Sequence, residues 1–245
     1  FQNRSATFMI LGSHCTRNCT FCNVSHGKTL TPDKEEPRNI AEAVKKLELK
    51  YAVITSVTRD DLDDGGAKHF AECINQVRKT NPGTAIEVLV PDFNGVEKSL
   101  DIVIASGPDV FGHNIETAGR LYSKIRPEAN YRRSLELLAY AKKHRPEMFV
   151  KSGIMVGLGE TEDDVYEIMK DVKSSGCDIF TIGQYLQPSS FHIEVKEYIK
   201  PIQFLKYKKA GERIGLRYIA SGPLVRSSYH AGEVLKAGVQ KIDLY

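Results

Sequence analysis

Two kinds of apolar pattern alternate along this chain. Short runs such as 51–57 are almost wholly apolar, which is typical of strands that are buried on both faces. Between them, apolar residues recur at helical spacing, as at Ile40, Val44 and Leu47. The predicted strands occupy 7–11, 51–57, 85–90, 109–116, 149–157, 179–186 and 216–220. The predicted helices occupy 40–50, 67–80, 96–106, 134–144, a stretch after Thr161, and 201–213.

The order of these elements predicts an α/β fold. About six β–α units follow one another, and this alternation favours a parallel sheet covered by helices, with right-handed crossovers. That number is below the eight units of a closed (β/α)8 barrel. Thr161 and Asp164 form a capping-box pattern at the start of one predicted helix. No linker or repeat divides the chain. We therefore predict a single domain over 1–245, with a core at about 6–220 and an appendage at about 221–245.

Composition narrows the function classes. The chain has 245 residues, of which 41% are hydrophobic and 27% charged, and its net charge is +3. These values are ordinary for a globular protein and too mildly basic to indicate nucleic-acid binding. Five cysteines are too few for a disulfide framework. No apolar run approaches the roughly 18 residues of a membrane span, so we expect neither nucleic acid nor a membrane among the partners.

The cysteines also indicate the cellular compartment in which the protein works. Reduced thiols indicate a reducing environment, and no signal peptide is visible. We therefore predict a cytoplasmic protein, with a mitochondrion or a plastid as the alternative. The chain begins at Phe1 rather than Met, so we also expect a further segment upstream.

Three cysteines crowd into one short string, HCTRNCTFCNV, directly after the first predicted strand. Cys15, Cys19 and Cys22 are close enough in sequence to act together as metal ligands or redox groups. A zinc site would normally need a fourth Cys or His at matching spacing, and no second pair is present. Iron–sulfur clusters ordinarily take four thiolates. Three thiolates would leave one iron open to a substrate or cofactor.

The Cys-x3-Cys-x2-Cys spacing, with Phe21 before the last cysteine, resembles the signature of radical S-adenosylmethionine (radical SAM) enzymes. The resemblance implies a [4Fe–4S] cluster on Cys15, Cys19 and Cys22, whose fourth iron chelates the methionine moiety of S-adenosylmethionine. One electron from the cluster then yields a 5′-deoxyadenosyl radical, chemistry that belongs to the cofactor. The implied fold is a partial (β/α)6 barrel of the radical SAM type with short N- and C-terminal extensions.

A glycine-rich string ends the predicted strand 149–157. GIMVGLGE resembles the G-x-I-x-G-x-x-E element that lies against the adenine in radical SAM enzymes, and this assigns Gly153, Gly157 and Glu160 to cofactor binding. Glycines there let the backbone approach a flat ligand. The alternative is a tight β–α turn that needs glycine for its dihedral angles alone.

Polar residues at another predicted strand end are further candidates. Asn114 and Glu116 end the strand 109–116, where ligands of parallel α/β folds gather. The resemblance suggests that Glu116 holds the ribose hydroxyls; the alternative is a capping or ion-paired carboxylate. Arg133 could bind the methionine carboxylate through its guanidinium fork, or it could simply begin a helix. The acids in 60–64 could form a cofactor or metal loop, but we prefer an acidic helix N-terminus.

The whole chain resembles the lipoyl synthase family. Nine strings occur in family order over 6–232. They are ATFMILG, HCTRNCTFCNV, VTRDDLDDGGA, EVLVPDF, HNIET, RSLELL, MVGLGET, TIGQYLQPS and GPLVRSSYHAG. The alternatives are another radical SAM sulfur transferase, such as a biotin-synthase-like enzyme, and a non-catalytic zinc-binding barrel.

The resemblance implies a specific reaction. Lipoyl synthases insert two sulfur atoms, at C6 and C8 of an octanoyl chain on a carrier lysine, and consume two S-adenosylmethionine molecules. The sulfur comes from a second, auxiliary [4Fe–4S] cluster, held by three upstream cysteines and one serine of the RSSY string. Both Ser227 and Ser228 are candidates here, whereas the upstream cysteines are absent from this chain. The implied partners are octanoylated lipoyl carrier domains (2-oxoacid dehydrogenase E2 subunits and the glycine cleavage H protein) and an electron donor such as ferredoxin or flavodoxin.

Overall fold

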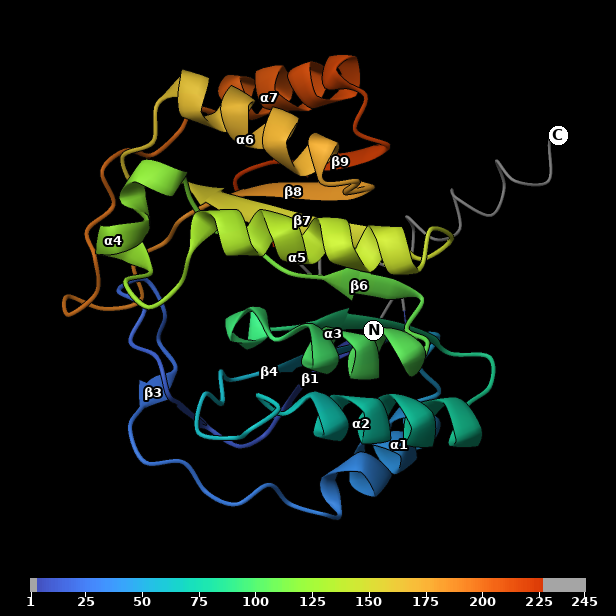
Figure 1. The fold of residues 1–245 in the computed structure, drawn as a ribbon. Coiled ribbons are helices and arrows are strands. Elements are labelled where there is room, and N and C mark those ends of the chain that lie inside the picture. The colour runs from blue at the N-terminus through green and yellow to red at the C-terminus, as the bar shows by residue number, and fades with distance from the viewer. Residues whose placement is uncertain (1–3, 227–245) are drawn as a thin grey trace, which may run out of the picture.

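An open, curved parallel sheet organises the structure, a computed structural model that describes residues 4–226 (Figure 1). Seven strands pair in parallel and in chain order. They are β1 (Ser5–Ile10), β4 (Tyr51–Ser56), β5 (Ala85–Leu89), β6 (Val110–Gly112), β7 (Phe149–Val156), β8 (Ile179–Gln184) and β9 (Tyr218–Ser221). A separate pair, β2 (His14–Cys15) and β3 (Ser25–His26), lies at the cysteine string. The predicted α/β class and partial barrel are confirmed.

The helices follow one another along the outside of the sheet, from α1 at the bottom of Figure 1 to α7 at the top. The long ones are α1 (Glu36–Lys46), α2 (Ala67–Thr80), α3 (Glu97–Ala105), α5 (Tyr131–His144), α6 (Glu162–Ser174) and α7 (Pro201–Ile214). The short ones are η1 (Phe93–Gly95), η2 (Gly119–Leu121) and α4 (Tyr122–Ile125). The predicted helices 67–80 and 201–213 agree with α2 and α7 to within one residue.

Residues on the outer face of the sheet pack against the helices and form the hydrophobic core. Ile54, Val88, Phe111 and Val150 are partners in register across four neighbouring strands, so they share one face. All four are fully buried in the main hydrophobic cluster, together with apolar residues of the helices. Burial of this face against the helices is the main source of stability.

The inner face of the sheet is more polar. Glu87 alternates with Val88 along β5 and therefore faces inward. Its carboxylate accepts hydrogen bonds from Tyr51 Oη at 2.6 Å and Lys151 Nζ at 2.8 Å, and all three side chains are buried. A buried charge is tolerated in this way only when it is paired and hydrogen-bonded.

Several predicted elements have different bounds. The predicted helix 40–50 is observed as α1, Glu36–Lys46, because Pro37 lies in its first turn and Glu48, with φ 49°, redirects the chain after it. The predicted strand 109–116 ends at Gly112, because the chain then leaves the regular ladder and pairs with β7 again at an isolated bridge between Glu116 and Ile154. The predicted helix 134–144 begins earlier, at Tyr131, because the Asn130 side chain accepts from Arg133 N at 3.0 Å and caps it.

The predicted C-terminal appendage begins inside the sheet. Ser221 is the last residue of β9, and the Pro223 carbonyl then accepts from Gln184 N at 3.3 Å. Ser227 and Ser228 lie outside the described residues. The structure therefore brings the chain to the end of β8 just before the RSSY string.

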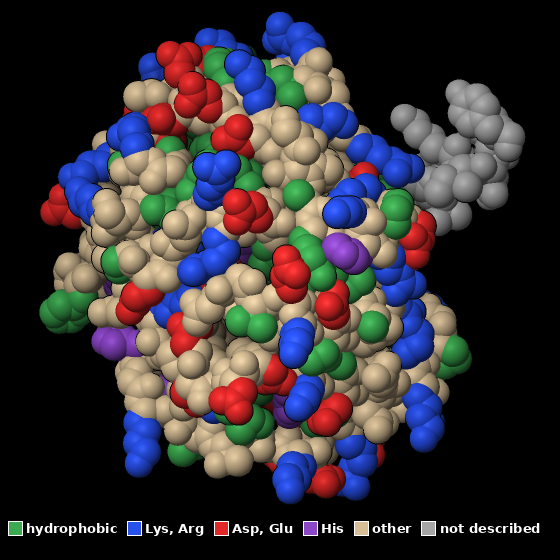
Figure 2. All heavy atoms as spheres, in the orientation of Figure 1, with side chains coloured by type: hydrophobic (Ala, Val, Ile, Leu, Met, Phe, Trp, Pro, Cys, Tyr) green, Lys and Arg blue, Asp and Glu red, His purple; other side chains and the backbone are tan. Residues whose placement is uncertain are grey.

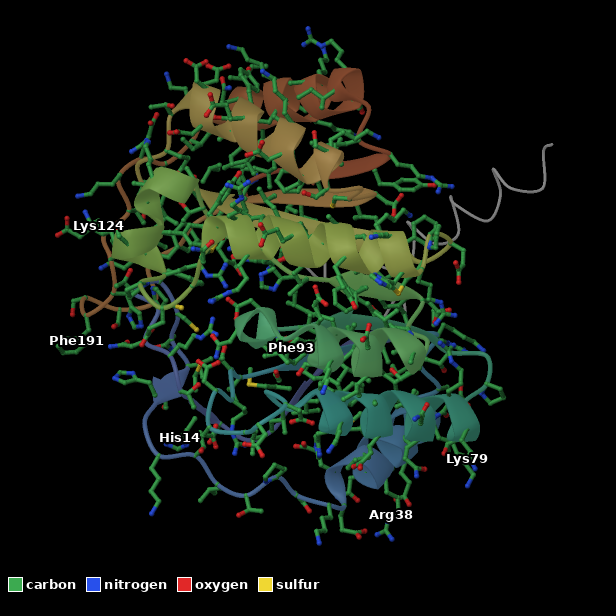
Figure 3. The ribbon with its side chains drawn as sticks, in the orientation of Figure 1. His14, Arg38, Lys79, Phe93, Lys124 and Phe191 are labelled. Atoms are coloured by element: carbon green, nitrogen blue, oxygen red, sulfur yellow. The ribbon has the colours of Figure 1, made fainter. Side chains whose placement is uncertain are left out.

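The surface carries mixed charge. Figure 2 shows basic and acidic side chains interspersed over one face of the molecule. Phe191, labelled in Figure 3, is 98% exposed between β8 and α7. None of the helices in the part of the chain that the structure describes is long and apolar enough to cross a bilayer.

Candidate active site

The cysteine string starts where β1 ends at the carboxyl edge of the sheet. Leu11 (φ 66°) and Gly12 (φ 89°) both take the left-handed conformation and turn the chain away from the strand. Cys15, Cys19 and Cys22 follow, all half-buried and none in a disulfide. The strand-to-loop turn thus delivers the thiols to the edge where parallel α/β folds bind ligands.

Backbone hydrogen bonds hold the string on its neighbours. Thr16 N donates to Thr58 O, after β4, at 3.0 Å, and Thr20 N donates to Ile125 O, at the end of α4, at 3.1 Å. Segments far apart in sequence therefore fix both halves of the string.

The three thiols line one cavity of about 210 Å³ together with the ends of β4, β5 and β6. Its polar lining side chains, apart from the cysteines, are Thr55, Ser56, Thr58, His113, Asn114, Glu116 and Arg126. Two buried polar atoms among them, Ser56 Oγ and Arg126 Nε, have no hydrogen-bond partner in the described part of the chain. Buried polar atoms are nearly always satisfied, so the cavity suits a polar ligand.

The thiols are not arranged around a single ion. Within residues 4–226, no three His, Cys, Asp or Glu side chains converge closely enough to hold one metal ion. A tetrahedral zinc site needs four ligands within about 2.3 Å of the metal. The geometry gives no support to the zinc-binding alternative, whereas thiols spaced around a cavity fit a cluster with several irons.

The protonation of the thiols is tied to metal binding. Burial raises the pKa of Cys19 to about 11, with a smaller contribution from the neighbouring thiols, and Arg126 acts in the opposite direction. Burial also raises the pKa of Cys22. Because only thiolates ligate iron, cluster binding must release these protons.

Cys15 is already surrounded by hydrogen-bond donors. Arg17 N lies 3.4 Å and Thr58 N 3.3 Å from Cys15 Sγ. Backbone N–H groups of this kind stabilise sulfur that carries negative charge, and such bonds tune iron–sulfur clusters. The donor set around the string therefore fits a thiolate-bound cluster.

Asn114 and Glu116 are the two predicted S-adenosylmethionine contacts that do line the cavity. Glu116 is held in the left-handed region (φ 69°) by hydrogen bonds to β7, from its own N to Gly153 O (3.0 Å) and from Met155 N to its carbonyl (2.9 Å). Non-glycine residues in this conformation cluster at functional sites. Burial raises the pKa of Glu116, although the Arg126 charge acts in the opposite direction.

Arg126 is a site residue that the sequence pattern missed. Its Nη1 donates to the carbonyls of Asn114 (3.0 Å) and Ile115 (3.3 Å), and the guanidinium also acts on Cys19 and Glu116. Its cation therefore lies close to both the Cys19 thiol and the Glu116 carboxylate. The signal in the sequence was an arginine directly before Pro127, where a helix must be interrupted, but no periodicity placed it at the cavity.

His113 also lines the cavity without having been predicted. It is 1% exposed, and its ring nitrogens lie 2.8 Å from Val90 O and 2.9 Å from Ser134 Oγ. Burial lowers its pKa to about 4, so the ring is neutral near pH 7. The histidine thus ties β5 to α5 beneath the cavity.

Gly157 and Glu160 do not line the cavity. The Glu160 carboxylate accepts from Gly157 N and from Leu158 N (3.1 Å), which orders the turn between β7 and α6. Gly157 has φ 101°, and a Cβ there would clash with the Gln184 side chain. This geometry matches the tight-turn alternative. Gly153 lies deeper, on β7, where a Cβ would meet Thr181 and Asn114.

Arg133 is also placed away from the cavity. Its Nε donates to Asp92 Oδ2 at 2.8 Å on the outer side of the sheet edge. Of the acids in 60–64, Asp61 pairs locally with Arg59 at 2.8 Å and Asp64 accepts from Gly66 N at 2.9 Å, whereas Asp60 pairs with Arg17 at 2.7 Å. Most of that loop therefore serves structure, as preferred from the sequence.

Known proteins agree with this fold and site. The family profile described as the Radical SAM superfamily matches residues 9–172. The fold is similar to that of Streptococcus suis SuiB bound to S-adenosylmethionine (TM-score 0.68, 10% identity, covering 88% of this chain and 49% of that one). It is also similar to HydG, a maturase of the [FeFe]-hydrogenase (TM-score 0.62, 14% identity, covering 88% and 56%). Fold, cysteine spacing and cavity together define a radical SAM enzyme.

Similarity to curated proteins identifies the family of radical SAM enzymes to which the chain belongs. The chain is 56% identical over 231 residues to a lipoyl synthase of Caldanaerobacter subterraneus subsp. tengcongensis, covering 94% of this chain and 81% of that protein. It is 55% identical to lipoyl synthases of Alkaliphilus metalliredigens and Caldicellulosiruptor saccharolyticus, in each case over 96% of this chain and 81% and 83% of theirs. The chain belongs to the lipoyl synthase family. Its cofactors are a [4Fe–4S] cluster and S-adenosylmethionine, and it acts in lipoyl formation on carrier proteins.

Proposed function

We propose that Cys15, Cys19 and Cys22 hold the [4Fe–4S] cluster of this lipoyl synthase and that S-adenosylmethionine occupies the adjoining cavity. One observation carries this assignment: the three thiols share a cavity of about 210 Å³ with Asn114 and Glu116 at the strand ends. When bound, the cluster supplies the electron that cleaves S-adenosylmethionine. The protein holds the cofactor in place and shields it from solvent.

The polar groups of the cavity orient S-adenosylmethionine. Glu116, with its strained backbone, accepts hydrogen bonds from the ribose hydroxyls. Arg126 pairs with the methionine carboxylate through its unpartnered Nε. The Glu116 carboxylate can only accept hydrogen bonds, as the ribose hydroxyls require, and the Arg126 guanidinium can only donate them, as the methionine carboxylate requires.

The sulfur donor is a second [4Fe–4S] cluster. Its ligands are Ser227 or Ser228 and three cysteines upstream of this chain. The chain supports this proposal by its course. Pro223 is hydrogen-bonded to Gln184 at the end of β8, and the RSSY string begins three residues later. Two sulfur atoms are inserted at C6 and C8 of the octanoyl chain.

The proposed partners are those that the resemblance to lipoyl synthases implies, and the charge of α7 is compatible with them. Lipoyl carrier domains are generally acidic, and Lys206, Lys208 and Lys209 are exposed on α7. Such complementary charge speeds association. The carriers are 2-oxoacid dehydrogenase E2 subunits and the glycine cleavage H protein. The electron comes from a ferredoxin or a flavodoxin, and the reaction takes place in the cytoplasm.

Cofactor cleavage tests the proposal. Anaerobically reconstituted protein, given dithionite, S-adenosylmethionine and an octanoyl-lysine carrier domain, should release 5′-deoxyadenosine and methionine, and should release less with dethiobiotin. Cys19→Ala should abolish this release, whereas Cys73→Ala, which removes a buried thiol outside the string, should retain it. Release by Cys19→Ala at the wild-type level would sink the ligand assignment.

A further inference from the structure

Arg17 lies within the cysteine string but plays no direct part in the cavity. It stands between Cys15 and Cys19, yet it is absent from the residues that line the cavity. Its side chain is only 4% exposed and runs to the other side of the string. An arginine buried at this point needs partners that offset its lost hydration.

Two carboxylates and an amide surround the guanidinium. Arg17 Nε and Nη2 bind both oxygens of Asp60, at 2.7 and 3.0 Å. Nη2 also lies 2.7 Å from Asp92 Oδ1 and 2.8 Å from Asn94 Oδ1. The string after β1 is thereby joined to the loop after β4 and to the turn after β5, which Phe93 marks in Figure 3.

The second oxygen of Asp92 extends the network to a helix. Asp92 is fully buried, and its Oδ2 binds Arg133, with Nη2 at 2.6 Å and Nε at 2.8 Å. Arg133 lies in the first turn of α5. Arg17, Asp60, Asp92 and Arg133, which we name the arginine clamp, contain two cations and two anions and so add no net charge beside the thiols.

We propose that the arginine clamp positions the cysteine string for cluster binding. This proposal rests on the ligand set Cys15, Cys19 and Cys22 and goes beyond it by assigning a role to Arg17 and Arg133. A buried ion network is costly in desolvation, and apolar residues often replace one without loss of stability. Stability alone therefore does not explain why this network is centred inside the string.

Hydrogen bonds link the clamp to a ligand sulfur. With its side chain fixed, Arg17 directs its own N–H at Cys15 Sγ, 3.4 Å away. Asp60 N donates to Thr16 Oγ1 at 3.0 Å, and this bond fixes Thr16, which lies between Cys15 and Arg17 in the sequence. Side chains that orient metal ligands in this way typically change metal affinity by roughly 10–100-fold when they are removed.

The test compares Asp60→Asn and Arg17→Lys with a matched control. The control, Lys151→Met, breaks the buried pair with Glu87 on the inner face, and neither residue lines the cavity that the cysteines share. Each full-length variant is reconstituted anaerobically, and its melting temperature, iron content in competition with a chelator and cluster midpoint potential are measured. In the cluster-free protein, alkylation rates of Cys15 and Cys19 are measured as well.

The clamp variants should hold iron at least about 10-fold more weakly than wild type, with a shifted potential and faster alkylation of Cys15. The Lys151→Met control should keep the iron affinity, midpoint potential and alkylation rates of wild type even if its melting temperature is lower. If both clamp variants had the iron affinity, midpoint potential and alkylation rates of wild type, the role of the clamp would be overturned while the ligand set would stand. The same conclusion would follow if their loss of iron affinity were no larger than that of Lys151→Met. Wild-type protein that binds no iron would instead overturn the ligand set.

Discussion

At the scale of single residues, sequence reasoning succeeded where a residue's place follows from its strand. Asn114 and Glu116 line the cavity because they follow a parallel strand at its carboxyl edge. It left Arg133 between two alternatives, of which the helix start matches its place in α5, and it did not identify Arg126, since both lie in segments whose position is set by tertiary contacts. The Arg133 guanidinium pairs with the buried Asp92, and the Arg126 guanidinium is held at the cavity by a hydrogen bond to the Asn114 carbonyl in the loop after β6.

Arg126 should therefore dominate the affinity for S-adenosylmethionine. Arg126→Met should weaken binding of S-adenosylmethionine to the reconstituted enzyme by roughly 10–100-fold, the loss of one charge-assisted hydrogen bond of about 1.5–3 kcal/mol. Calorimetric titration measures it. Arg120→Met is the matched control, because Arg120 pairs with Asp164 on the surface and does not line the cavity. Equal affinity in the Arg126 variant and wild type would contradict the assignment.

Asp92 should give the fold an acid-sensitive contribution. Burial alone raises the pKa of Asp92, but the Arg17 hydrogen bond and charge lower it well below its ordinary value of 3.8. Its contribution is therefore complete above that value and is lost as the pH falls through the lower folded pKa. Asp92→Asn should cost roughly 3–5 kcal/mol of unfolding free energy at pH 7.

Denaturant unfolding of wild type and Asp92→Asn over a pH series measures this effect. The difference between the two should be constant from pH 7 to pH 5 and should shrink only below the ordinary carboxyl pKa. A difference that grows on acidification would mean that the Asp92 pKa is raised rather than lowered.

At the scale of elements, local signals worked best where they need no distant partner. The capping box predicted at Thr161 is present, with Asp164 N donating to Thr161 Oγ1 at 3.2 Å and the Asp164 carboxylate accepting from Thr161 N. The strand predicted at 109–116 was too long because its last residues lie outside the regular ladder: Glu116 takes a positive φ and is held by hydrogen bonds to β7. The pair β2–β3 was missed because its pairing closes around the cysteine string.

The Thr161 cap offers a test at this scale. Thr161→Ala should destabilise the protein by about 1 kcal/mol, or about 2–4 °C in melting temperature for a chain of this size. Thr161→Ser, which keeps the hydroxyl, is the control and should lie close to wild type. An alanine variant that melts with wild type would show that tertiary packing rather than the cap fixes the start of α6.

At the scale of the whole molecule, alternation of the two apolar patterns predicted the parallel sheet covered by helices, whereas the partial barrel was implied by the family resemblance. Strands such as β4 and β7 are mostly apolar, and the intervening helices have one apolar stripe each, so the layer order was already determined. The contents of the inner face were not predictable in the same way. The Glu87–Lys151 pair joins residues 64 positions apart, and no local pattern connects them.

The central claim is that Cys15, Cys19 and Cys22 bind a cluster with one iron open to the cavity. Electron paramagnetic resonance of the reduced, reconstituted protein, with iron analysis, tests it most directly. We predict about four irons that depend on these cysteines and a signal that changes when S-adenosylmethionine is added. An iron content that is unchanged after Cys15, Cys19 and Cys22 are all replaced by alanine, or a signal indifferent to S-adenosylmethionine, would contradict the account.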